Sequence, residues 1–240
     1  MILKTLSEAV GVSGDEGDVR AVVIDAVRQY VDEINVDALG NVLTFKRGTA
    51  KPGAGPHAGA EAPSESEPRR LRVMLDAHMD EVGLMVAGHD SDGFLRVRSV
   101  GGVDARLLPG ALLQVGPEHI PGVVGVKPIH LLDEGEDQKV PKFKDLVVDI
   151  GAGGKDEAKK LAPPGTYAAF ATRFREMGPT VSGKAFDDRA GCAALVELLK
   201  GERFSFDLYA AFTVQEEVGL RGARVAAYAV NPDCAFALEG

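Results

Sequence analysis

Four clusters of acidic and histidine side chains are the residues of this sequence best suited to chemistry. They are His78-Met79-Asp80, Asp187-Asp188, Glu216-Glu217 and Glu239. Each falls at or just beyond the end of a predicted strand, and open α/β sheets bind ligands outside the carboxyl ends of their strands. One imidazole and several carboxylates form a ligand set that suits Zn²⁺ and other divalent first-row metals. The sequence therefore predicts a metal site at one edge of a sheet.

Each cluster taken alone also has a structural interpretation. A neutral His78 bonded to Asp80 is a common buried pair, and Asp187-Asp188 could form the charged first turn of a helix. Glu216-Glu217 follows the apolar run AAFTV, where two buried carboxylates are costly without a partner. Because separate strands of one sheet would bring the four clusters together, we favour the joint interpretation as a site.

Glu216 and Glu217 cannot serve the same atom, because neighbouring residues on an extended segment point to opposite sides. One of them can bind a metal ion while the other faces a substrate. A glycosidase needs two carboxyl groups that face each other across a cleft, so this adjacent pair counts against a carbohydrate hydrolase. That class stays open as an alternative.

The segments around these clusters alternate between helix and strand patterns. Ser13 and Glu16 have capping-box spacing, and apolar residues at helical spacing up to Val31 predict a helix of about five turns. The run INVDALGNVLTF predicts a hairpin. Further strands are predicted in LRVMLDA, VGLMVA, FDLYAAFTV and CAFALE, and helices in DRAGCAALVELLK and VGLRGARVAAYA. This alternation predicts an α/β domain with a mainly parallel sheet.

The middle of the chain has a different pattern. Short strand candidates, FLRVRSV, ALLQV, GVVGV and LVVDI, are separated by Gly, Pro and acidic turns, with one short helix candidate, KDEAKKLA. Strands at this spacing indicate a small β-barrel or sandwich. We therefore expect an α/β catalytic domain over 1–86 and 179–240, interrupted by an inserted barrel-like domain over 87–178. Residues 48–70 are rich in Gly, Ala, Pro, Ser and Glu, which predicts a disordered surface loop.

The composition narrows the class of protein. A content of 45% hydrophobic and 26% charged residues is ordinary for a soluble globular protein. The net charge of -9, with scattered basic residues, argues against a nucleic-acid partner. We find neither a signal peptide nor an uncharged run long enough to cross a bilayer, so we expect a cytoplasmic protein without a membrane partner. Cys192 and Cys234 lie in apolar stretches and fit buried free thiols better than a disulfide.

Five motifs occur in the order in which one known family carries them: DAHMDEVGLMV (76–86), VGGVDARLLPG (100–110), GVVGVKPIHLL (122–132), GKAFDDRAGC (183–192) and VQEEVGLRGA (214–223). Through them the chain, from Leu3 to Gly240 apart from 48–70, resembles the metal-dependent aminopeptidases of the tetrahedral, or TET, type. That family includes glutamyl and deblocking aminopeptidases and members once labelled endoglucanase.

The resemblance implies a fold, cofactors and partners. The family has an α/β catalytic domain with an inserted β domain that serves oligomerisation. By the same resemblance we expect two divalent metal ions per subunit, with Zn²⁺ favoured and Co²⁺ or Mn²⁺ as alternatives. The implied substrates are peptides, and the implied assembly is a homo-oligomer in which dimers build a tetrahedral dodecamer.

The resemblance also implies a role for each metal ligand. His78 resembles the histidine ligand of one metal ion, and Glu217 resembles a further ligand. Asp187, the first of its pair, resembles the carboxylate that bridges both ions. Glu239 occupies the place of the terminal carboxylate ligand, where many members of the family have Asp.

Two further residues take catalytic roles by the same resemblance. Asp80 resembles the acid that orients His78 through its other ring nitrogen. Glu216 resembles the general base, which takes a proton from a water activated by two metal ions and passes it to the leaving amine. The implied reaction is hydrolysis of the first peptide bond of a peptide with a free α-amino group.

The family pattern continues beyond Glu239 with a second histidine ligand and the last elements of the catalytic domain. This sequence stops at Gly240, so one metal ion would lack its imidazole. The chain is then a fragment, or the product of a split or truncated gene, or a subunit whose partner supplies the missing part. The alternative to an active aminopeptidase is a catalytically incompetent member that acts only in oligomerisation or binding.

Overall fold

The apolar runs that the sequence marks as strands form two separate β structures in the computed structural model. Two units result, and we call them the sheet unit and the barrel unit. The structure describes residues 1–51, 69–128, 130 and 140–239. The sheet unit comprises the described parts of Met1–Ala9, Glu16–Asp80 and Ala185–Gly240, and the barrel unit those of Val10–Asp15 and Glu81–Lys184. The loop predicted over 48–70 lies outside the described residues except at its two ends.

Five strands form the central sheet of the sheet unit: β1 (Glu33–Val36), β2 (Val42–Lys46), β3 (Arg72–His78), β12 (Asp207–Thr213) and β13 (Cys234–Ala237). Their order is β1-β2-β12-β3-β13. β12 and β13 run parallel to β3, whereas β1 and β12 run antiparallel to β2. The predicted α/β fold class is confirmed, but the sheet is mixed rather than mainly parallel, because the β1–β2 hairpin reverses the chain.

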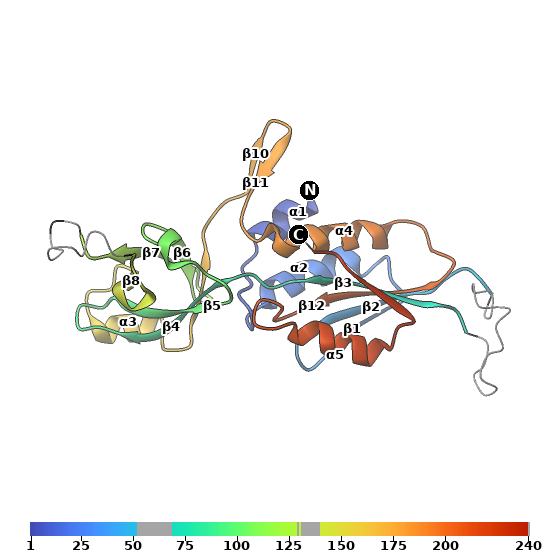
Figure 1. Ribbon diagram of the computed structural model, residues 1–240, viewed down its shortest axis with the longest axis horizontal. Coiled ribbons are helices and arrows are strands. Elements are labelled where there is room, and N and C mark those ends of the chain that lie inside the picture. Colours follow the sequence, from blue (N-terminus) through green and yellow to red (C-terminus); the bar gives the residue numbers. More distant parts are fainter. Residues whose placement is uncertain (52–68, 129, 131–139, 240) are drawn as a thin grey trace. The chain divides into compact units, whose positions relative to one another are not determined.

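Helices cover both faces of this sheet (Figure 1). They are α1 (Ile2–Glu8), α2 (Gly17–Val27), α4 (Phe186–Lys200) and α5 (Arg221–Val230). The larger core joins α1, α2 and α4 to one face of the sheet, with Leu6, Val23, Leu195 and Phe212 fully buried. A smaller core joins α5 to the other face around Ala226. Burying one large apolar side chain of this kind stabilises the fold by about 1.5–3 kcal/mol.

The predicted capping box at Ser13 is wrong. Helix α2 begins at Gly17 with Glu16 as its N-cap, and no side chain caps it. The backbone of Ser13 instead bonds to the Glu81 carbonyl oxygen, beside a bridge between Val12 and Glu81. The helix has 11 residues, which is about three turns and not the predicted five, and its C-cap is Arg28.

Six strands close into the barrel of the other unit in the order β4-β5-β8-β7-β6-β9. Leu84, Leu95, Leu113 and Val148 are among the side chains that fill its interior. This closure removes the exposed strand edges that an open sheet would leave. The strands are β4 (Gly83–His89), β5 (Leu95–Val100), β6 (Leu112–Val115), β7 (Ile120–Val126), β8 (Leu146–Asp149) and β9 (Tyr167–Phe170).

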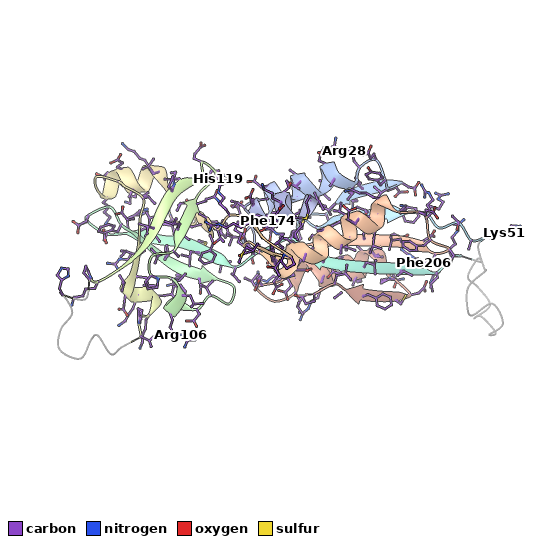
Figure 2. The ribbon with its side chains drawn as sticks, turned by 90° about the horizontal axis from the view of Figure 1, so that it is seen from above. Arg28, Lys51, Arg106, His119, Phe174 and Phe206 are labelled. Carbon is purple, nitrogen blue, oxygen red and sulfur yellow. The ribbon has the colours of Figure 1, made fainter. Side chains whose placement is uncertain are left out.

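Shorter elements complete the barrel unit. The helix α3 (Lys155–Leu161) was predicted, and the 3-10 turns η1 (Ala105–Leu107) and η3 (Phe143–Asp145) connect strands. The antiparallel hairpin of β10 (Arg175–Met177) and β11 (Thr180–Ser182) pairs only within itself in the described residues. Figure 2 shows the side chains, with Arg106 and His119 on the barrel unit. Among the helices that the structure describes, none has the length and apolar character to span a membrane.

Candidate functional site

Three of the predicted carboxylates converge on one ring nitrogen of His78, the last residue of β3. The imidazole is 1% exposed, and its Nε2 atom lies 3.0 Å from Asp187 Oδ1. The same nitrogen lies 3.6 Å from Glu239 Oε1 and 3.8 Å from Glu216 Oε2. The ends of β3, β12 and β13 thus meet the start of α4 around a single imidazole, and this grouping is the candidate site.

Asp80 connects two of these segments. Its backbone carbonyl oxygen lies 3.2 Å from His78 Nδ1, and its Oδ1 atom lies 3.4 Å from the same nitrogen. The fully buried carboxylate accepts hydrogen bonds from the backbone N–H of Glu216 at 2.9 Å and of Glu217 at 3.1 Å. Asp80 therefore fixes both the imidazole and the turn that carries the two glutamates.

The pair Asp187-Asp188 opens α4 and does not follow a strand of the sheet, which corrects the strand-end placement predicted for it. Both residues have non-helical backbone angles, and the peptide bond between them is cis. Asp188 accepts hydrogen bonds from the backbone N–H of His78 at 3.1 Å and of Gly191 at 3.0 Å. A Cβ atom at position 191 would collide with the Asp188 carboxylate, so glycine is needed there.

Asp188 is also a site residue that the sequence argument did not single out as a ligand. One ligand atom from each of His78, Asp188 and Glu239 lies within 4.8 Å of the others, close enough to hold a metal ion. The adjacent acidic pair indicated that Asp187 or Asp188 could bind a metal ion. The sequence could not show which of the two carboxylates lies toward His78 and Glu239. Glu217 differs from the other predicted ligands in its distance from His78. Among the described residues, the carboxylates within 4 Å of the imidazole are those of other residues, and Glu217 is not one of them.

The candidate site contains several carboxyl groups whose negative form is disfavoured by burial. Burial raises the pKa of Asp188 to about 7 and also raises the pKa of Glu217 and of Glu239. Burial lowers the pKa of His78, but hydrogen bonds to Asp80 and Asp187 and the charges of Asp80 and Asp188 outweigh it and raise this pKa to about 10. A cluster of carboxylates that favours a positive imidazole also favours a bound cation.

The donor set fits a divalent metal ion. Imidazole nitrogen and carboxylate oxygen are suitable ligands for Zn²⁺, Co²⁺ and Mn²⁺. Asp76 lies two residues before His78 on β3, and its buried Oδ1 atom has no hydrogen-bond partner within the described parts of the chain. Burial raises the pKa of Asp76 to about 6, because this carboxyl group loses its contact with water.

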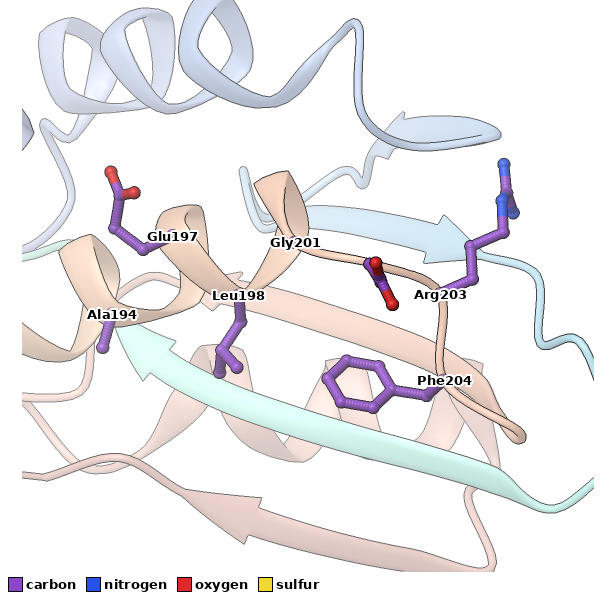
Figure 3. A pocket seen from close by; sticks show the side chains of 7 residues that line it. Ala194, Glu197, Leu198, Gly201, Arg203 and Phe204 are labelled. Carbon is purple, nitrogen blue, oxygen red and sulfur yellow. The ribbon is translucent and has the colours of Figure 1, made fainter.

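A groove of about 640 Å³ lies at the other end of α4 (Figure 3). A helix rises about 1.5 Å per residue, so the groove is on the order of 10–20 Å from Asp187 along α4. It contains none of the residues that surround His78, and we do not assign it to the candidate site. Its lining residues are Ala194, Glu197, Leu198, Gly201, Glu202, Arg203 and Phe204.

The comparison with known proteins places this fold among aminopeptidases. The chain is 35% identical over 253 residues to a lysyl aminopeptidase of Pyrococcus furiosus, a match that covers 99% of this chain and 65% of that protein. An aminopeptidase structure from the archaeon Desulfurococcus kamchatkensis matches with a TM-score of 0.86 and 35% identity, over 99% of this chain and 62% of that one. This chain therefore spans less than two thirds of both proteins.

A second solved structure is a TET1 peptidase of Pyrococcus horikoshii, which is described as able to assemble into a tetrahedron or a large octahedral shell. It matches with a TM-score of 0.83 and 35% identity, over 99% of this chain and 67% of that one. The sequence pattern of the M42 glutamyl aminopeptidase family matches residues 60–240. Because that pattern covers most of the chain, and the matching structures share its fold, this protein belongs to the M42 glutamyl aminopeptidase family.

Proposed function

We propose that the protein is a metal-dependent aminopeptidase that removes N-terminal residues from peptides. The observation that carries this proposal is the convergence of Asp187, Glu216 and Glu239 on Nε2 of His78 in a member of a peptidase family. Family membership supports peptide hydrolysis, and the donor set supports dependence on a metal ion. This chain spans less than two thirds of the length of two of its relatives, so the activity of the whole protein is part of this proposal.

We assign the metal ligands in line with the resemblance. His78, Asp187, Glu217 and Glu239 would hold two divalent ions, Zn²⁺ in preference to Co²⁺ or Mn²⁺. The proximity of Asp188 to His78 and Glu239 supports an additional contribution from this carboxylate. When bound, such ions lower the pKa of water and polarise a carbonyl group.

Glu216 is the residue that we assign to proton transfer. Its carboxylate faces the imidazole at 3.8 Å, and its backbone N–H is held by Asp80, so its position is defined by a buried partner. It would accept a proton from the attacking water and deliver it to the leaving amine. Asp80 acts through His78 and Glu216 and is therefore a positioning residue.

Two alternatives are less well supported. A carbohydrate hydrolase requires two carboxyl groups across a cleft, whereas Glu216 and Glu217 are neighbours in one turn held by a single carboxylate. A catalytically incompetent subunit would not need so many acidic groups around one buried histidine, because their repulsion costs stability when no cation is bound.

Assembly and location follow as further proposals. A relative that forms closed shells supports a homo-oligomer of this chain. We propose the barrel unit as the contact region, as the resemblance implies. A tetrahedral dodecamer built from dimers stays a prediction, as does a cytoplasmic location.

Hydrolysis of aminoacyl-p-nitroanilides tests the proposed reaction. The Zn²⁺- or Co²⁺-loaded protein should release p-nitroaniline, and EDTA should abolish the release. Glu216→Gln should bind metal as the wild type does yet lose about 10²- to 10⁴-fold in kcat. Glu202→Gln, which changes an exposed glutamate of the groove, is the matched control and should keep full activity.

The outcomes separate the proposals. Wild-type turnover by Glu216→Gln would reject this residue as the base. Full metal loading without any turnover by the unaltered chain would favour the incompetent subunit. Cleavage of cellulose-type substrates that survives EDTA would favour the carbohydrate hydrolase.

A further inference from the structure

Arg189 is the largest fully buried side chain in the described residues, and it lies two positions after Asp187. Its Nε atom donates a hydrogen bond to the carbonyl oxygen of Met79 at 2.7 Å. Its Nη1 atom donates to the carbonyl oxygens of Leu6 and Ala9, the latter at 3.1 Å. One guanidinium thus joins the start of α4, the segment after β3 and the end of α1.

The end of α1 is a suitable partner for this charge. The last carbonyl groups of a helix have no partner within the helix and carry partial negative charge. A buried cation is tolerated when fixed acceptors replace its water, and the planar guanidinium can donate to several carbonyls at once. Arg189 therefore orders three segments that are far apart in the sequence.

The peptide groups around Met79 are held from several sides. The Met79 N–H donates to the Thr213 carbonyl oxygen at 2.7 Å, on β12. The His78 N–H donates to Asp188 at 3.1 Å, and the His78 carbonyl oxygen accepts from the thiol of Cys192 at 3.2 Å. The Arg189 bond to the Met79 carbonyl oxygen completes this set, so the backbone between His78 and Asp80 cannot rotate without breaking it.

We propose that Arg189 is a positioning residue for the site, which fixes the backbone of Met79 and thereby the imidazole of His78 and the carboxylate of Asp80. Helix α1 is the support against which the guanidinium is held. The proposal concerns the geometry of residues 78–80, and it rests on the proposed function only for the identity of the bound ion. Loss of the guanidinium would loosen the site without removing any ligand.

Lys46 provides a matched control in the same unit. It is also buried, and its Nζ atom donates to the carbonyl oxygens of Leu199 and Gly201, both at 2.6 Å. These carbonyls lie at the end of α4 that is remote from the site. Lys46→Met therefore removes the hydrogen bonds from a buried cation to a helix terminus, as Arg189→Lys does at α1, but leaves the site residues untouched.

The first measurement is amide hydrogen exchange in the metal-free full chain, because it does not depend on activity or on a metal. In Arg189→Lys, which keeps the charge but cannot reach the three carbonyls together, exchange at Met79 should rise by about tenfold or more. Lys46→Met should leave exchange at Met79 unchanged and raise it near Leu199. Equal exchange at Met79 in the wild type and Arg189→Lys overturns the proposal.

The second measurement is Co²⁺ titration followed by calorimetry and by the visible absorption of the bound ion. Arg189→Lys should bind Co²⁺ about 10- to 100-fold more weakly and with an altered spectrum, as expected when a group that orients a ligand is lost. Equal weakening in Arg189→Lys and Lys46→Met would mean that binding follows global stability, which also overturns the proposal. Absence of Co²⁺ binding by the wild type would count against the proposed function, and the exchange data would then decide the positioning role.

Discussion

The carboxylate of Asp80 accepts hydrogen bonds from two consecutive backbone N–H groups, those of Glu216 and Glu217. An asparagine at this position has a single acceptor oxygen, so one of the two N–H groups would face an amide N–H₂ group. We predict that Asp80→Asn lowers the affinity for Zn²⁺ by about 10- to 100-fold while the protein stays folded. Calorimetric titration checks this, with the exposed Asp92→Asn as control. Equal affinities in the three proteins would contradict it.

At the level of single residues, the sequence predicted which side chains lie close together better than it predicted their contacts. Because His78, Glu216 and Glu239 follow predicted strands, the sequence predicted that they lie close together, and in the structure they do. It could not show that Asp188 lies against the backbone of His78, because this depends on non-helical angles at the start of α4. The sequence also did not indicate that Arg189 is buried, because a charged residue in the first turn of a helix is normally exposed.

The first turn of α5 packs on the segment that follows β12 and leads to Glu216 and Glu217. The N–H of Gly222 donates to the Val214 carbonyl oxygen at 3.0 Å, and Asn41 bonds to both residues. A Cβ atom at position 222 would collide with Asn41 and with the backbone of Val214. We predict that Gly222→Ala destabilises the protein by about 1–3 kcal/mol in urea unfolding. Gly102→Ala, where a Cβ meets open space, should be nearly neutral.

The segment before β1 carries an ion pair that should give a pH-dependent stability. Hydrogen bonds from Arg203 and from the backbone of Arg47 lower the pKa of Asp32 to about 2 from its usual 3.8. A depressed carboxyl pKa stabilises the folded state above about pH 4, and this stability is lost as the pH falls through about 2.

The urea midpoint of Asp32→Asn should therefore lie below that of the wild type at pH 7, and the difference should shrink at pH 3. The effect should be modest because the pair is partly exposed. Asp25→Asn, in a more exposed pair with Arg28, is the control and should differ little from the wild type at either pH. A difference for Asp32→Asn that stays constant with pH would count against this assignment.

At the level of elements, apolar runs and turn residues predicted most strands and helices, but local motifs were less reliable. The Ser13 capping box failed because α2 begins only at Gly17, while the backbone N–H of Ser13 donates to the carbonyl oxygen of Glu81, a partner far along the chain. The sequence of β9, a four-residue strand with two alanines, does not stand out as a strand, because its apolar pattern is weak without its barrel neighbours. Tertiary pairing decided both cases.

At the level of the whole molecule, the alternation of α/β and short-strand patterns indicated an interrupted α/β domain, and the structure has both a helix-covered sheet and a closed barrel. The pairings that close the barrel could not be derived, because many strand orders bury the same apolar faces. The sequence alone also could not give the register, which depends on contacts between strands.

The barrel exposes an apolar pair that fits the proposed homo-oligomer. Leu112 on β6 is 65% exposed and pairs with Val123 on β7, which is 38% exposed. Contiguous patches of exposed apolar side chains mark contact surfaces, and we take this pair as the candidate centre of such a patch. We predict that Leu112→Glu shifts the protein to smaller species in sedimentation velocity, whereas Glu118→Gln at an exposed position does not. An unchanged distribution for Leu112→Glu would exclude this surface from the contact.

The most direct test of the site is a Zn²⁺ titration of the unaltered chain and of Asp187→Ala, with bound metal counted after desalting. The oxygen of Asp187 that lies 3.0 Å from His78 Nε2 should be a ligand, so the unaltered chain should retain at least one ion per chain and Asp187→Ala should retain far less. Fewer than one ion in the unaltered chain, or equal retention by both proteins, would contradict the assignment of this cluster as a metal site.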